Sequence, residues 1–249
     1  MGFRLFDECY ICRYCKHPNH LNTAFILKPH ILEADSIQKR FGEKTIVSDV
    51  YLKCQTGEIL GLLGRNGSGK STLLKIIFGI VAADNKFIRI DGVVKQTLSS
   101  LMREISYLHQ DNFIPENFSV QKAISLSVDR QKLKEIYADE MVVSMKNKKV
   151  SQLSGGEKRY LEIKLILCGD SKFVLLDEPY NGLSPVMIEK INALIITNSA
   201  QKGLIITDHN YTNVIQIATK LILMKDGKAH HLRHKSELVE NGYLTEGML

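Results

Sequence analysis

Residues 64–71 combine three glycines with a lysine and a serine at fixed spacing. The stretch reads Gly64-Arg-Asn-Gly-Ser-Gly-Lys70-Ser71 and fits the pattern G-x(4)-G-K-[ST] without a mismatch. Glycines let backbone N–H groups approach a triphosphate closely, Lys70 adds a point charge at the β- and γ-phosphates, and the Ser71 hydroxyl is a ligand for Mg²⁺. A strand-like run precedes the stretch and a helix-like run follows it, which is the required context. The sequence therefore predicts a P-loop, and not a glycine-rich turn without a ligand.

Two carboxylates, Asp177 and Glu178, directly follow the apolar run "FVLL". This run predicts a buried strand, and α/β sheets bind their ligands at the carboxyl ends of such strands. We expect Asp177 to hold Mg²⁺, directly or through water, and Glu178 to take a proton from an attacking water. The alternative is a polar strand end without chemistry, which the P-loop makes the weaker interpretation.

A second glycine-rich stretch, Ser154-Gly155-Gly156, stands where a helix is expected to begin. Glu157 and apolar residues at helical spacing follow it. Backbone N–H groups at the positive end of a helix dipole suit an anion. Because the P-loop already supplies one phosphate site, the sequence poses the question of what a second anion site would bind.

The amino-acid composition indicates the size and class of the domain and argues against nucleic acid as a ligand. The chain has 249 residues, 44% of them hydrophobic, which fits one α/β domain with an inserted subdomain. Its net charge of +6 comes from 33 basic and 27 acidic side chains, and +2 of it lies in residues 1–30. The remaining +4 is too small to indicate nucleic acid as a main ligand.

Membrane and export signals are weak in this sequence. No apolar run approaches the ~18 residues that span a bilayer. The first residues, "MGFRLFDECYICRYC", lack the uninterrupted apolar core of a secretory signal. Five cysteines, an odd number, favour a reducing cytoplasm. We expect an intracellular protein whose membrane part, if it acts at a membrane, is another chain.

The pattern of apolar residues divides the chain into regions of different character. Residues 31–110 predict short strands separated by turns, with one helix at residues 70–78 that ends at Gly79. Residues 112–150 predict helices, the first beginning at Ser119. After residue 150, helices alternate with the strands "KFVLL", "GLIIT" and "KLILM", which is typical of a parallel sheet covered by helices. The stretch 112–168 is therefore an insert, and no internal repeat is visible.

With the P-loop, "FVLLDEP" at 173–179 and "LSGGE" at 153–157, the sequence resembles the nucleotide-binding subunits of ABC transporters. The resemblance covers residues 31–244, with residues 1–30 as an extension and 245–249 as a tail. It implies an α/β fold of the P-loop NTPase type. This fold has a mainly parallel sheet covered by helices, an antiparallel β subdomain near the N-terminus and an inserted α-helical subdomain at about 112–168. In that family two subunits meet head to tail, and "LSGGE" of one closes over the ATP in the P-loop of the other.

The resemblance also implies a set of site residues. Gln110 matches a glutamine that ligates Mg²⁺ and couples to the membrane subunit, His209 matches the switch histidine at the γ-phosphate, and Phe41 lies where an aromatic ring stacks on adenine. The residues expected to bind ATP are Phe41, Gly64, Arg65, Asn66, Gly67, Ser68, Gly69, Lys70, Ser71, Thr72 and Gln110, with Ser154, Gly155 and Gly156 on the partner's ATP. The expected metal ligands are Ser71, Gln110 and Asp177, and the expected catalytic residues are Lys70, Glu178 and His209. Each of Gln110, His209 and Phe41 also has a structural interpretation, as a surface glutamine, a strand-end cap and a core aromatic.

One position departs from the family pattern. After the catalytic glutamate the family usually has Ser-Gly/Ala-Leu-Asp, whereas this chain has Asn-Gly-Leu-Ser at 181–184. Ser184 followed by Pro185 is still a sound helix start, so we expect the structural role to persist. Any charge that the aspartate contributes across the dimer is lost.

The resemblance implies an ATPase that uses ATP and Mg²⁺ as a homodimer or paired subunit. It would lie on the inner face of the cell membrane, peripheral to a separate permease. Within the family, "LIITDHN" and the C-terminal "ELVENGYL" are most similar to ATPases of lipopolysaccharide export or branched-chain amino-acid uptake. The alternative is a soluble ABC-type ATPase without a transporter, such as an iron–sulfur-assembly or regulatory factor. Repair types have long coiled coils, for which the 82 residues between Lys70 and Gln152 are too few, and ribosome-associated types have two cassettes.

The first residues offer five soft metal ligands within 12 positions, namely Cys9, Cys12, Cys15, His17 and His20. A small zinc or iron–sulfur site is one interpretation. Zinc modules usually separate two ligand pairs by a dozen residues and the ferredoxin pattern needs a fourth cysteine before proline, and neither feature is present. A disordered extension and a start assigned too far upstream are the other two interpretations.

Overall fold

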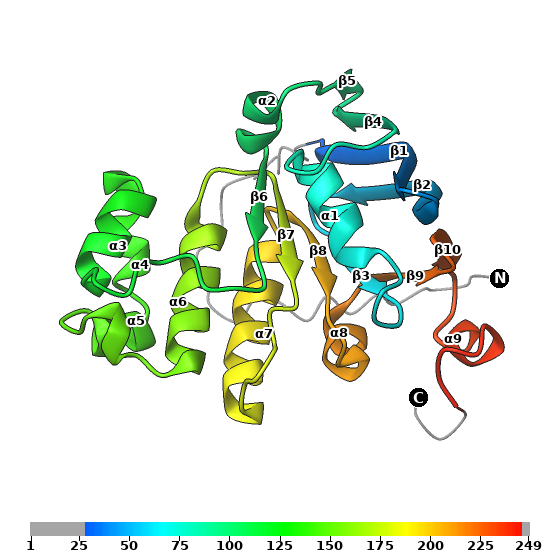
Figure 1. The fold of residues 1–249 in the computed structure, drawn as a ribbon. Helices are drawn as coiled ribbons and strands as arrows, with labels where there is room; N and C mark the ends of the chain where they lie inside the picture. Colours follow the sequence, from blue (N-terminus) through cyan, green and yellow to red (C-terminus); the bar gives the residue numbers. More distant parts are fainter. Residues whose placement is uncertain (1–27, 246–249) are drawn as a thin grey trace, which may run out of the picture.

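The structure is a computed structural model that describes residues 28–245 (Figure 1). Two sheets organise it. The larger has the strand order β10-β9-β3-β8-β7-β6, parallel except for the antiparallel edge strand β10. Its strands are β3 (Ile59–Leu63), β6 (Ile105–Leu108), β7 (Phe173–Asp177), β8 (Gly203–Thr207), β9 (Lys220–Lys225) and β10 (Lys228–Leu232). Because helices cover both faces, β3, β7 and β8 are buried along their whole length, as their apolar runs predict.

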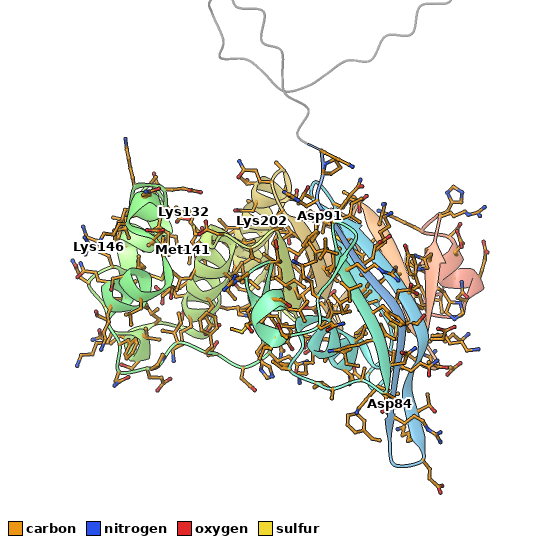
Figure 2. The ribbon with its side chains drawn as sticks, turned by 90° about the horizontal axis from the view of Figure 1, so that it is seen from above. Asp84, Asp91, Lys132, Met141, Lys146 and Lys202 are labelled. Carbon is orange, nitrogen blue, oxygen red and sulfur yellow. The ribbon has the colours of Figure 1, made fainter. Side chains whose placement is uncertain are left out.

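The smaller sheet is antiparallel and has the order β2-β1-β4-β5. Its strands are β1 (Ile31–Phe41), β2 (Lys44–Gln55), β4 (Asn85–Ile90) and β5 (Val93–Val94). Figure 2 places Asp84 and Asp91, which flank β4 of this sheet, on the opposite side of the molecule from the helical segment that contains Lys132, Met141 and Lys146.

Helix α1 (Lys70–Phe78) lies between the two sheets. Its buried residues Leu73, Leu74, Ile76 and Ile77 pack against β1 and β2 on one side and against β3, β7 and β8 on the other. The opposite face of the large sheet is covered by α6 (Gly155–Cys168), α7 (Pro185–Ser199) and α8 (Tyr211–Ile217). Two cores thus fix the sheet from both faces, and the carboxyl ends of its parallel strands stay open for ligands.

The helical insert connects β6 to β7. It contains α3 (Val120–Ser127), α4 (Leu133–Ile136), α5 (Glu140–Met145) and two single 3₁₀ turns, Arg130–Lys132 and Val150–Gln152, before α6 begins. α6 joins this insert to the sheet, because its buried residues belong to the same core as those of α3, α5 and β7 (Figure 1). The remaining short helices are α2 (Leu98–Met102) and α9 (Glu237–Glu240).

The observed elements confirm the predicted α/β fold, with its antiparallel and helical subdomains. Residues 70–78 form the predicted helix, and Gly79 ends it in the left-handed conformation with φ 96°. The prediction of a single helix in residues 31–110 is wrong, because α2 is a second one. α2 has only five residues after its N-cap Thr97, too few to show a helical period.

Two further expectations concern the ends of the chain and the membrane. The proposed extension with Cys9, Cys12, Cys15, His17 and His20 lies outside the described residues, as does the tail after residue 245. Within residues 28–245, the helices are all too short or too polar to cross a lipid bilayer.

Candidate active site

The P-loop connects β3 to α1 and gives α1 a bare N-terminus. Gly69 is the N-cap, with φ 99° and no side-chain cap. A Cβ at this position would lie 2.8 Å from the carbonyl oxygen of Ile46, so both the backbone conformation and the space require glycine. The first N–H groups of α1 have no partner within the helix and point to where an anion would lie.

Lys70 is a buried cation at this N-terminus, with 6% of the residue exposed. Its Nζ donates to the carbonyl oxygens of Gly64 at 2.7 Å and Arg65 at 3.2 Å. Burial lowers the pKa of Lys70 from its ordinary value, while the nearby carboxylates of Glu178, Asp177 and Asp208 act against this. The ammonium is therefore held in reach of the loop, where a phosphate can replace the carbonyl oxygens as its partner.

Asp177, at the end of β7, has hydrogen-bond partners for both carboxylate oxygens. Oδ1 accepts from the hydroxyls of Ser71 at 2.9 Å and Thr207 at 2.8 Å, and Oδ2 accepts from the Tyr107 hydroxyl at 2.9 Å. Burial, followed by the Asp177 charge, raises the pKa of Tyr107, so its phenol stays protonated and remains a donor. Hydroxyl groups from the P-loop and from the two strands that flank β7, namely β6 and β8, thus orient one carboxylate.

The predicted metal ligands meet at this point. Gln110 follows β6, and its Nε2 donates to the Ser71 hydroxyl oxygen at 3.3 Å, while that hydroxyl donates to Asp177 Oδ1. Hydroxyl, carboxylate and amide oxygens are the hard ligands that Mg²⁺ prefers. The chemistry of this set therefore fits Mg²⁺, and Ser71, Gln110 and Asp177 are the residues that would hold it.

Glu178 has a backbone conformation that is rare for residues other than glycine, with φ 49°. Its N–H donates to the carbonyl oxygen of Thr207 at 2.9 Å. His209 follows β8, and its Nδ1 lies 4.0 Å from Glu178 Oε2 and 3.6 Å from Asp208 Oδ1. Asp208 is fully buried, and this burial raises its pKa although the N–H groups of Asn210 and Tyr180 donate to it. The base and the switch histidine predicted from sequence are therefore neighbours.

A cavity of about 570 Å³ joins several of these groups, but Asp177 and the predicted nucleotide-binding residues Gly64 and Arg65 are not among the described residues that line it. Its lining contains Phe41, Lys44, Ile46, Asn66, Gly67, Ser68, Gly69, Lys70, Ser71, Thr72, Gln110, Glu178 and His209. Phe41, at the end of β1, is 54% exposed, so it is not a core aromatic. Lys39 Nζ lies over its ring, 4.8 Å from the centre, so an adenine stacked on Phe41 would use the opposite face or displace the lysine.

Ser154, Gly155 and Gly156 are not among the described residues that line this cavity. They form the start of α6, where the Ser154 hydroxyl accepts from Glu157 N–H at 3.2 Å and Glu157 Oε2 accepts from Ser154 N–H at 2.7 Å. This capping box confirms the predicted helix start. Space around Gly155 is open, since a Cβ there would meet no atom within 4 Å.

Sequence reasoning missed several residues of the site. They are Lys44 and Ile46 in the cavity, Tyr107 and Thr207 on Asp177, Asp208 beside His209, and the buried pair Arg159 and Glu162 on α6. None of them has a local motif. Ser184 is present as predicted: its hydroxyl accepts from Met187 N–H at 3.4 Å and caps α7, which begins at Pro185.

Comparison with known proteins gives the family. A family model described as "ABC transporter" matches residues 47–181. The lipopolysaccharide export system ATP-binding protein LptB of Haemophilus influenzae is 33% identical over 213 residues, which cover 80% of this chain and 88% of that protein. ABC transporter A family member 11 of Dictyostelium discoideum is 31% identical over 246 residues, and the match spans 30% of that longer protein.

Solved structures agree on the fold. An ATP-binding cassette of an ABC transporter in its ADP conformation superposes with a TM-score of 0.70 at 22% identity, over 88% of this chain and 96% of that one. An ATP-binding subunit of another ABC transporter gives a TM-score of 0.74 at 18% identity, over 86% of this chain and 94% of that one. With the P-loop, the buried Asp177 and the capped α6 in place, the chain belongs to the ABC transporter family and is one of its ATP-binding subunits.

Proposed function

We propose that this chain hydrolyses ATP to power a separate membrane permease, and that it does so by closing head to tail with a second copy or a paired subunit. One observation carries the proposal. The chain has two glycine-rich helix starts; one lines the cavity with Lys70 and Glu178, and the other, at Ser154, lies exposed outside that cavity. A partner's nucleotide would give the second start its ligand.

The cavity assigns each residue a task. Phe41 stacks on the adenine, the P-loop N–H groups and Lys70 bind the phosphates, and Ser71, Gln110 and Asp177 hold Mg²⁺. Mg²⁺ held by these residues would neutralise negative charge on the phosphate groups. Glu178 takes the proton from the attacking water, and His209, whose Nδ1 lies 4.0 Å from Glu178 Oε2, contacts the γ-phosphate.

The permease part of the proposal rests on the relatives. Several of them are named as ATP-binding proteins of a lipopolysaccharide export system, and each covers most of this chain. Such a system must move its cargo through a membrane. We therefore place this chain on the inner face of the cell membrane, bound to a permease that is a different polypeptide.

Mixing two inactive variants tests the head-to-tail arrangement. Ser154→Arg puts a long side chain at the start of α6, where it blocks a second phosphate group, and leaves residues 64–72 unchanged. Lys70→Ala damages the P-loop and leaves α6 unchanged. In their heterodimer both lesions fall in one of the two composite sites, so the other site is intact and the mixture should regain activity.

Two outcomes would contradict the arrangement. If mixing gives no rescue at any ratio, each chain uses its own "LSGGE". If Ser154→Arg alone keeps the wild-type rate, the start of α6 is not part of the site. Calorimetry must show that Ser154→Arg still binds ATP, since only then does loss of hydrolysis report on the dimer.

Affinity purification from detergent-solubilised membranes tests the permease. A tagged chain should bring down a multi-span membrane protein in stoichiometric amount. Recovery of the chain from the soluble fraction alone, with no membrane protein attached, would instead support the soluble ABC-type ATPase.

A further inference from the structure

Arg159 is an almost completely buried arginine in the second turn of α6, with 5% of the residue exposed. Its guanidinium lies against the carboxyl end of β7. Nη2 donates to the carbonyl oxygens of Asp177 at 3.1 Å and Glu178 at 3.0 Å, and Nε donates to that of Pro179 at 3.4 Å. One side chain therefore binds three consecutive carbonyl groups, in the segment that contains the metal ligand and the base.

The same guanidinium also reaches the segment that contains Gln110. Arg159 Nη1 donates to the carbonyl oxygen of His109 at 2.8 Å. Glu162, three residues further along α6 and fully buried, lies 3.5 Å from Nη1 and accepts from the N–H groups of Phe113 at 2.7 Å and Ile114 at 3.4 Å. Arg159 and Glu162 thus fix both ends of residues 109–114 to α6.

Stability alone explains this pair poorly. Burying two charges costs free energy that their mutual attraction often does not recover, so a buried ion pair is weak evidence of stabilisation. Here the partners of the pair are mostly backbone groups of the site. The Glu178 peptide is held from both sides, because its N–H donates to Thr207 and its carbonyl accepts from Arg159. A non-glycine residue keeps φ 49° only where its surroundings enforce it.

We propose that Arg159 is a positioning residue that connects the start of α6 to Glu178 and Gln110 of the same chain, with Glu162 as its support. This inference rests on the proposed function, in which the start of α6 contacts the partner's ATP. Five residues, about one and a half helical turns, separate Ser154 from Arg159, and a helix can transmit displacement as a rigid element. Engagement of the partner's nucleotide by α6 is therefore passed to the base of the chain's own site. The two sites of the dimer become coupled, and hydrolysis becomes cooperative in ATP.

Arg159→Lys is the sharpest test, because lysine keeps the charge but has no planar fork that could bind these acceptors together. We expect kcat to fall by about 10–10²-fold, the size of effect that a misplaced catalytic group produces. The Hill coefficient should fall towards one. The affinity for ATP measured without added Mg²⁺ should stay at the wild-type value, because Arg159 makes no contact with the P-loop among the hydrogen bonds described.

Arg89→Lys is the matched control. Arg89 donates to Asp35 at 3.1 Å in the antiparallel sheet, away from the cavity, so the same substitution there should leave kcat and the Hill coefficient unchanged. Glu162→Gln is the second variant. It keeps the shape and an acceptor for Phe113 N–H but removes the ion pair, and it should reproduce a smaller loss of cooperativity even if Arg159→Lys does not fold.

The outcomes separate this inference from the proposed function. A wild-type Hill coefficient of one overturns the coupling while the ATPase remains. The coupling is also overturned if Arg159→Lys folds and keeps the wild-type kcat and Hill coefficient, whether or not its unfolding temperature changes. If Glu178→Gln stays monomeric with ATP, the dimer itself fails, whatever Arg159 does. Lower kcat and lower cooperativity in Arg159→Lys, with ATP affinity unchanged, support the inference.

Discussion

Helices α1 and α6 both begin at glycines, but their first turns are filled differently. α1 has Gly69 as its N-cap, no side-chain cap and no acidic residue in its first turn, and it carries the buried Lys70. α6 has the Ser154 hydroxyl as its cap and Glu157 as its own carboxylate. α1 therefore keeps its N–H groups and a cation for a ligand, whereas α6 is already a complete helix end.

This difference supports the proposal that the start of α1 forms a nucleotide site, whereas the start of α6 completes a partner's site. The phosphate groups of a nucleotide need cations and metal ligands, and the described residues provide both around α1. α6 offers an exposed hydroxyl and two glycine N–H groups, with an acidic residue close by. It can contribute to a phosphate that is already neutralised elsewhere, which is the role that a head-to-tail partner would give it.

Glu178→Gln should have the largest effect. Removal of a positioned base lowers the rate of hydrolysis by about 10²–10⁴-fold, while ATP and Mg²⁺ binding persist. Since ATP is then not consumed, the start of α1 in one chain and the start of α6 in its partner should stay bound to the same nucleotide. Gel filtration should therefore show a dimer with ATP and a monomer without it. A monomer under both conditions would mean that α6 does not complete the site, and near-normal turnover would mean that Glu178 is not the base.

Lys70→Ala should weaken ATP binding by about 10–10²-fold, because a hydrogen-bonded charge is lost from the phosphate site. Calorimetry on the isolated chain measures this. Lys75→Ala, on the same helix but outside the cavity lining, is the control and should bind ATP normally. Ser154→Arg should also bind normally. An equal loss of affinity in Ser154→Arg and Lys70→Ala would remove the distinction between the two helix starts.

Both helix starts could be predicted from sequence because their signals are local. The P-loop spacing, the left-handed Gly79 and the Ser154–Glu157 capping box each lie within a few residues of the feature that they determine. Asp177 and Glu178 were predicted for a similar reason, since a buried strand leads directly to them. The family resemblance then supplied Phe41, Gln110 and His209, which the structure brings to the same cavity.

What sequence could not predict depends on contacts between distant residues. Tyr107 and Asp177 are 70 positions apart, and Arg159 and His109 are 50 apart. No spacing rule connects a tyrosine in the middle of β6 to a carboxylate at the end of β7. Parallel pairing of these two strands creates the contact, and it is visible only once their register is known. α2 and β5 were missed for a different reason, because five and two residues show no period.

Tyr107→Phe should moderately raise the Mg²⁺ requirement for hydrolysis, because it affects only the site at the start of α1. The substitution removes the hydroxyl that orients Asp177 Oδ2. Loss of such a supporting hydrogen bond typically lowers the affinity of a site for its metal by about 10-fold or more. We expect hydrolysis to need that much more Mg²⁺ for half-maximal rate, with ATP affinity in EDTA unchanged. Tyr51→Phe, whose hydroxyl donates to Glu33 in the antiparallel sheet, is the control. An unchanged Mg²⁺ requirement would show that Asp177 is oriented without Tyr107.

The smallest expected effect is on the stability of the chain without nucleotide, and it comes from the capping residue Glu157 at the start of α6. The N–H of Ser154, opposed by partial burial and helped by Lys148 at 3.0 Å, lowers the pKa of Glu157 in the folded chain. A lowered folded-state pKa gives stability above the unfolded value of about 4.3, and this stability disappears as pH falls through the folded value. Glu157→Gln should therefore lower the free energy of unfolding at pH 7 by about 0.3–1 kcal/mol, the usual size for a carboxylate at a helix N-terminus.

Urea unfolding of both chains across this pH range measures the difference, which should shrink towards zero in acid. Glu43→Gln, in the exposed turn between β1 and β2, is the control and should change the unfolding midpoint little at any pH. A difference that stays constant with pH would mean that Glu157 acts through packing and not through its charge. The charge of Glu157 would then not distinguish the first turn of α6 from that of α1, and that part of the comparison between the two helix starts would fail.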